Sequence, residues 1–97
     1  MMNMHETEIP TGLSAILYGL YHVENVRADE LYKGLPNYLN INLDEEEKRE
    51  YKQALDWATK NPSFDFNSIL PNLRKTNDEI LVYLKKYRQF SNLFSAE

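Results

Sequence analysis

The sequence contains no cysteine, and that absence excludes several kinds of protein. Without Cys there are no disulfides, no thiolate metal sites and no cysteine nucleophile, and small secreted domains usually need disulfides to be stable. No apolar run approaches the roughly 20 residues that a membrane span requires. Residues 1–10 also lack the basic start and the apolar stretch of a signal peptide. We therefore expect a cytoplasmic protein without a membrane-spanning segment.

Glycine and histidine are scarce, and their positions argue against an enzyme. The glycines form no phosphate-binding motif, because they stand far apart at Gly12, Gly19 and Gly34. His5 lies in the N-terminal segment and His22 within a predicted helix, where a packing role is the simpler interpretation. No set of Glu-x-x-His motifs occurs, and the acidic run at 44–50 lacks the turn glycine of a calcium loop. We expect no catalytic residue, no metal site and no cofactor.

The charge is mildly acidic and unevenly distributed. The formal net charge is −4, with 10 acidic against 4 basic side chains in residues 1–50 and 5 against 7 in residues 51–97. Two interpretations remain open: ordinary variation among helix surfaces, or a molecule with an acidic end and a basic end. A general nucleic-acid binder would carry a clear basic excess, so this function is disfavoured.

The length and the hydrophobic content predict one globular domain. The chain has 97 residues, of which 42% are hydrophobic, close to the usual share in folded domains. We assign residues 1–10 to a flexible N-terminal tail and residues 11–97 to a single helical domain. The predicted fold class is all-α, a small helical bundle of three long helices plus one short helix.

The helices are predicted from apolar spacing and from signals at their ends. Two of them begin with a capping-box pattern, Asp44 with Glu47 and Thr76 with Glu79. The predicted helices span 12–33, 44–60, from 63 or 65 to 70, and 77–92.

Residues 35–43 are predicted to be a connector rather than a helix. Leu39, Ile41 and Leu43 alternate with polar residues, which is the period of a strand. No second strand of comparable quality is present to pair with it. Because a lone strand cannot satisfy its backbone hydrogen bonds, we expect an extended loop anchored by its apolar side chains.

The first predicted helix follows Thr11 as its N-cap and can bend or break near Asn25. It is apolar on nearly every side, which is typical of an enclosed helix. One side carries Leu13, Leu17 and Leu20, and the other carries Ala15, Tyr18, Gly19, His22 and Val26. Two interpretations remain open for this second side. Either other helices of the same chain cover it, or a second chain does.

Further candidate contact residues lie at the edges of the later helices. Trp57 stands at the rim of the core face of the 44–60 helix, where a lid over the core is the simpler interpretation. Val82, Lys86 and Leu93 project away from the main apolar stripe of the 77–92 helix. The candidate partner interface comprises Ala15, Tyr18, Gly19, His22, Val26, Trp57, Val82, Lys86 and Leu93.

The sequence favours a non-enzymatic protein-interaction module, such as a small adaptor, inhibitor or immunity-type regulator with a protein partner. Its seven Tyr, four Phe and one Trp are side chains that dominate cores and interfaces alike. One alternative is a self-assembling structural subunit, such as a dimer, that uses the second side of the first helix. Another is a weak binder of nucleic acid or anionic surfaces through the basic C-terminal helix.

Overall fold

A computed structural model describes residues 9–94, and its regular structure in that range is entirely helical. The predicted all-α fold class is confirmed, although the helix lengths differ from the prediction. Two helices are long, and two have only eight residues. The α-helices are α1 (Thr11–Tyr18), α2 (Leu35–Asn42), α3 (Glu45–Lys60) and α4 (Asn77–Phe90), and the 3₁₀ turns are η2 (Gly19–His22), η3 (Asp29–Tyr32) and η4 (Phe66–Ser68).

The two long helices begin where their capping boxes predict. The Asp44 carboxylate accepts a hydrogen bond from the Glu47 backbone N–H at 2.8 Å, and the Glu47 carboxylate accepts one from the Asp44 N–H at 3.0 Å. Thr76 and Glu79 make the same reciprocal pair at the start of α4. The N–H donated by Thr76 stabilises the Glu79 carboxylate and holds the pKa of Glu79 below its usual value. Local signals therefore suffice to start both helices.

The predicted long first helix is broken, and α1 ends at Tyr18. The chain continues as the single turn η2 and becomes extended at Val23. The side chain of Asn25 then accepts a hydrogen bond from the Arg27 N–H at 3.0 Å, a local turn that competes with helical hydrogen bonding. At the other end Pro10, not Thr11, is the N-cap residue. The break near Asn25 is confirmed, but the helix does not resume at full length beyond it.

The prediction of an extended loop at 35–43 is wrong, because residues Leu35–Asn42 form α2. Pro36 stands at the start of this helix, where its missing N–H costs nothing. Only Leu39 is fully buried, and Ile41 is 71% exposed. The strand-like alternation would have put both side chains on one face, whereas the helix turns them to different sides. The backbone of Leu43 is extended, and this residue ends α2 before α3 begins.

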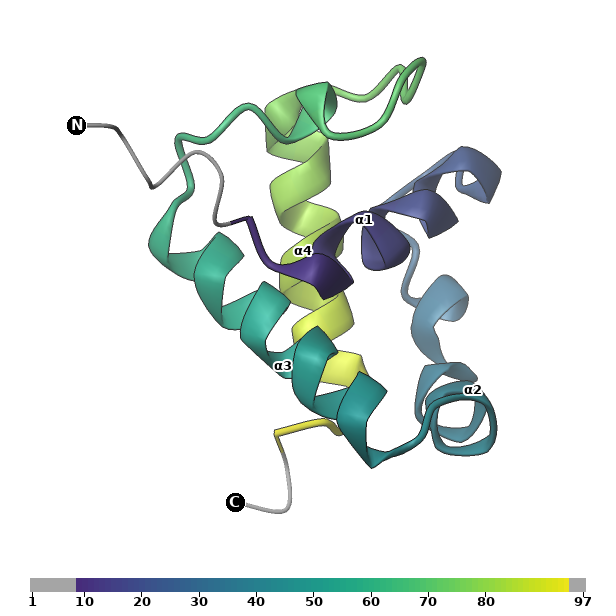
Figure 1. Ribbon diagram of the computed structural model, residues 1–97. Helices are drawn as coiled ribbons and strands as arrows, with labels where there is room; N and C mark the ends of the chain where they lie inside the picture. Colours follow the sequence, from purple (N-terminus) through teal and green to yellow (C-terminus); the bar gives the residue numbers. More distant parts are fainter. Residues whose placement is uncertain (1–8, 95–97) are drawn as a thin grey trace, which may run out of the picture.

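The core forms where α1 packs on α3 and α3 packs on α4 (Figure 1). Gly12 allows α1 to approach closely, since a Cβ atom there would lie 2.8 Å from the Glu50 carbonyl oxygen of α3. The fully buried large side chains are Leu13, Ile16, Leu17, Leu20, Val26, Leu39, Leu55, Phe66 and Ile80. These side chains form one core, in which α1 packs on α3 and η2 while α2, α3, η3 and η4 pack on α4.

The predicted tail lies largely outside the described residues, which begin at Ile9. The side chain of Ile9 is half-buried and packs against the core, directly before the N-cap Pro10. Among the described helices, none is both long and apolar enough to cross a membrane.

Candidate functional site

Part of the candidate interface is enclosed by the chain itself. A Cβ atom on Gly19 would lie 2.7 Å from the hydroxyl oxygen of Tyr83, on α4. Val26 is only 2% exposed and belongs to the core, and its carbonyl accepts a hydrogen bond from the Tyr32 hydroxyl at 2.7 Å. At Gly19 and Val26 the neighbouring atoms therefore belong to the same chain. Neither residue is available for contact with a partner.

The rest of the same helix side is exposed. Ala15, Tyr18 and His22 all face solvent, with Tyr18 60% exposed. The Tyr18 ring meets Tyr21 edge-on at a centroid distance of 5.3 Å and His22 at 6.4 Å. Tyr21 is itself exposed, and its hydroxyl donates a hydrogen bond to the Pro71 carbonyl. These aromatic side chains form an exposed group at the end of α1 and in η2.

Trp57 covers the core, as the simpler interpretation of its position suggests. Its ring packs edge-on against Phe64 at 5.1 Å and against Phe66 at 6.3 Å, while those two rings lie 5.4 Å apart. The Trp57 side chain is half-buried in this aromatic cluster. Since packing accounts for its position, Trp57 is a weak candidate for a partner contact.

The three candidates on and after α4 are Val82, Lys86 and Leu93, and each of them makes contacts within the chain. Val82 is half-buried and packs against the core, and Leu93 does the same after the helix has ended. Lys86 forms an ion pair with Asp29 and lies 5.9 Å from the centroid of the Phe90 ring. Lys86 thus ties α4 to η3, and these three residues do not join the exposed group on η2.

Four exposed side chains were not among the sequence candidates. They are Tyr21, Leu31, Tyr38 and Ile41. Tyr38 and Ile41 lie one turn apart on α2 and are 58% and 71% exposed. The strand-like interpretation of 35–43 concealed them. The sequence signal that could have revealed them is Leu35-Pro36 after Gly34, since Pro is favoured in the first helical turn.

All of the exposed large hydrophobic side chains among residues 9–94 lie in one segment of the chain. We call this set the exposed apolar surface: Tyr18, Tyr21, Leu31, Tyr38 and Ile41. Tyr18 is the last residue of α1, and the others lie on η2, η3 and α2, which follow one another along the side of the molecule away from most of α3 (Figure 1). Exposed apolar side chains of this kind are candidates for contact with a partner.

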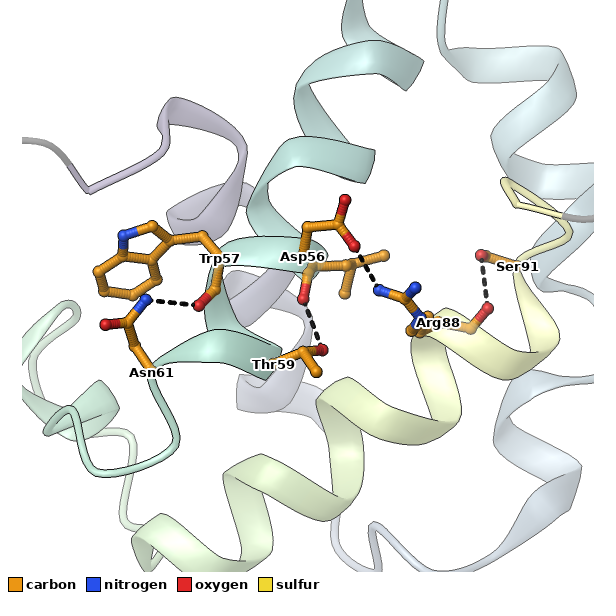
Figure 2. Close-up of polar contacts among 7 residues, drawn as sticks. Asp56, Trp57, Thr59, Asn61, Arg88 and Ser91 are labelled. Carbon is orange, nitrogen blue, oxygen red and sulfur yellow. Dashed lines mark hydrogen bonds and ion pairs between the residues drawn. The ribbon is translucent and has the colours of Figure 1, made fainter. Parts of the chain in front are cut away.

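The C-terminal half of α3 and α4 border a shallow groove of about 460 Å³. Arg88 reaches from α4 to Asp56 on α3, with 2.7 Å between Nη1 and Oδ1 (Figure 2). Thr59 and Asn61 instead donate hydrogen bonds back to carbonyls of their own helix, at 2.9 and 2.8 Å. The Thr59 hydroxyl thus uses its hydrogen in a bond to the backbone. We interpret these contacts as links within and between the helices.

A second groove, of about 630 Å³, lies between α2, the first half of α3 and the turn after α4. Its basic side chains are Lys48, Arg49 and Lys52. Lys48 Nζ donates a hydrogen bond to Asn40 Oδ1 at 3.1 Å, which joins α3 to α2. The predicted basic surface was on α4, where Lys86 and Arg88 pair with acids and where Lys85 and Arg88 line the first groove. The basic side chains of the second groove are on α3.

Within the described range, no group of three or more His, Asp or Glu side chains is arranged to hold a metal ion. No family model, no curated protein and no solved structure matches this chain.

Proposed function

We propose that this protein is a non-enzymatic interaction module that acts in the cytoplasm and binds a partner protein through its exposed apolar surface. The observation that carries the proposal is the confinement of all exposed large hydrophobics in the described chain to positions between Tyr18 and Ile41. The other large apolar side chains of residues 9–94 are buried or half-buried. Tyrosine is also among the residues that contribute most to binding at interfaces.

The segment that carries the exposed apolar surface has nearly balanced charges. Between Tyr18 and Ile41 the charged residues are Glu24, Arg27, Asp29, Glu30 and Lys33, three acidic against two basic. Asp29 and Glu30 both have a basic partner, Lys86 and Lys33 respectively. Apolar contact is therefore expected to dominate the affinity. This balance favours an adaptor-like partner contact over an acidic inhibitor that covers a basic active site.

A single side chain tests the proposal. Burial of an Ile side chain contributes about 1.5–3 kcal/mol, so Ile41→Asn should weaken binding about tenfold or more. Because Ile41 is exposed, the variant should fold as well as the parent. Gln53→Ala, at an exposed position of α3 outside the surface, is the matched control.

The measurement is affinity capture from a lysate of the source organism, followed by mass spectrometry. The three baits are the parent protein, Ile41→Asn and Gln53→Ala. We expect proteins that the parent and Gln53→Ala both retain and that Ile41→Asn loses. Identical captures on all three baits would contradict the proposal. Sedimentation of the pure protein separates the self-assembly alternative: a dimer that Ile41→Asn dissociates would identify a second copy as the partner.

A further inference from the structure

The groove between α2 and α3 has a charge opposite to that of the molecule. It is lined by Pro36, Asn37, Leu39, Asn40, Glu45, Lys48, Arg49, Lys52, Ser91, Asn92 and Leu93. The charged members are three basic side chains and one carboxylate, a local charge of +2 in a chain whose net charge is −4. Glu45 is highly exposed, with 89% of its side chain accessible, so its carboxylate is well solvated. The basic side chains therefore favour an anionic ligand in this groove.

The three basic side chains of the groove are hydrogen-bond donors only. Lysine can only donate, so the contact from Lys48 Nζ requires the Asn40 side chain to turn its oxygen toward α3. The Asn40 amide then has its NH₂ group left to offer to a ligand. With the ammonium and guanidinium groups beside it, this donor favours a ligand that is rich in acceptors, such as carboxylates.

The cations form a row and do not converge on one point. Lys48 is held by Asn40 and, at 3.7 Å, by Glu45; Arg49 is held by Glu46 at 3.0 Å. Lys52 lies one turn further along α3, with its ammonium 5.7 Å from the centroid of the Phe94 ring. Because each cation contacts a different partner, the three do not converge on one point, as the binding of a single phosphate would require.

The spacing of the row fits an extended chain. Lys48 and Lys52 are four residues apart, or about 6 Å along a helix that rises 1.5 Å per residue. Alternate side chains on one face of an extended peptide are about 6.6 Å apart. Pro36 and Leu93, both half-buried, add apolar lining that can contact aliphatic side chains between the carboxylates.

We propose that the groove between α2 and α3 binds an extended acidic segment of a partner protein. This site is independent of the exposed apolar surface, which uses other side chains of α2. Asn37 and Asn40 face the groove, whereas Tyr38 and Ile41 are the exposed members of the apolar surface. Failure of one site therefore leaves the other proposal untouched.

The test uses a fluorescent peptide in which Glu alternates with Leu and Ser, and a control peptide in which every Glu is replaced by Gln. Anisotropy measures the affinity, and amide chemical shifts of the labelled full chain locate the site. We expect the acidic peptide to bind at low salt, to bind more weakly as salt rises, and to shift the signals of Asn37, Asn40 and Leu93. The Gln peptide should not bind.

Charge reversal in the groove supplies the specificity control. Arg49→Glu should weaken peptide binding at least about tenfold, because it replaces a cation of the groove, which pairs with the exposed Glu46 carboxylate at 3.0 Å, with an anion. Lys60→Glu makes the same charge change at an exposed end of α3 outside the groove, and should leave the affinity within about twofold. Ile41→Asn should also bind the peptide normally. If Arg49→Glu fails to fold, Lys52→Gln replaces it.

Several results would overturn the proposal. Equal binding of the Glu and Gln peptides, or equal losses for Arg49→Glu and Lys60→Glu, would show that the groove does not recognise acidic side chains. If inorganic phosphate alone produced the same shifts and the peptide added none, the groove would be a single-anion site. If a single-stranded oligonucleotide bound there more tightly than the peptide, the ligand would be nucleic acid.

Discussion

The hydroxyl oxygen of Tyr83 lies 2.7 Å from the position that a Cβ atom on Gly19 would occupy. The same hydroxyl donates a buried hydrogen bond to the Ile16 carbonyl at 2.9 Å. α4 therefore closes over the end of α1 through a contact that needs a residue without a side chain at position 19. This intramolecular neighbour accounts for the glycine, which would otherwise weaken a helical segment by about 0.5–1 kcal/mol relative to alanine.

Gly19→Leu should lower the free energy of unfolding by about 1–3 kcal/mol, because the new side chain must displace Tyr83 from a packed site. The oligomeric state should not change. Chemical denaturation and sedimentation of the same variant measure both quantities. A variant that is as stable as the parent but loses self-association would instead place a second chain against Gly19.

A double-mutant cycle isolates the contact. Tyr83→Phe removes the hydroxyl and its hydrogen bond to the Ile16 carbonyl, which still accepts one from the Gly19 N–H, at a cost of about 0.5–1.5 kcal/mol. Gly19→Ala should be destabilising in the parent and close to neutral once the hydroxyl is gone. Additive losses in the double variant, measured by denaturant titration, would show that the two positions do not interact.

Gly12→Ala should destabilise the protein by about 1–3 kcal/mol by pushing α1 away from α3. Its Cβ would lie 2.8 Å from the Glu50 carbonyl oxygen and 3.2 Å from the Tyr51 nitrogen, and backbone atoms cannot rotate aside. Gly34→Ala is the control, because a Cβ there meets nothing within 4 Å and should change stability by no more than about 0.5 kcal/mol. Thermal melts of both variants measure the difference in stability. Equal melting temperatures for Gly12→Ala and Gly34→Ala would refute the close approach of α1 to α3.

Four tyrosines should make the fold sensitive to alkali. Burial, with a smaller contribution from Asp29, raises the pKa of Tyr32 to about 12. Burial likewise raises the pKa values of Tyr51, Tyr83 and Tyr87 above their ordinary value of 10.0. Because the folded state holds these protons more tightly than the unfolded state, their contribution to stability is complete below pH 10 and is lost as the pH rises through the folded-state values.

The measurement is a titration from neutral pH to strong alkali, followed by tyrosinate absorbance and by far-ultraviolet circular dichroism. We expect part of the absorbance change to coincide with the loss of helix, since Tyr83 and Tyr87 are buried and ionise on unfolding. Tyr87→Phe should reduce the amplitude of that coincident step. If all tyrosinate absorbance appeared while the helix signal was intact, these residues would be accessible in the folded protein.

Helix starts were predictable where the chain supplies its own hydrogen-bond partners. Asp44 with Glu47 and Thr76 with Glu79 satisfy backbone donors within four residues, so α3 and α4 begin as predicted. Ion pairs between helices could not be predicted in this way. Asp56 on α3 pairs with Arg88 on α4, 32 residues along the chain, and only packing brings these two side chains together.

The sequence by itself determined the all-α class, the starts of α3 and α4, and the buried side of α1 that carries Leu13 and Leu17, because these follow from local hydrogen bonds and from the spacing of apolar side chains. Only the tertiary structure decided which sides remain exposed. Leu39 is buried and Ile41 is exposed because α2 is held as a helix against α3 and α4. The basic groove arises in the same way, since Lys48 meets Asn40 only after the two helices have packed.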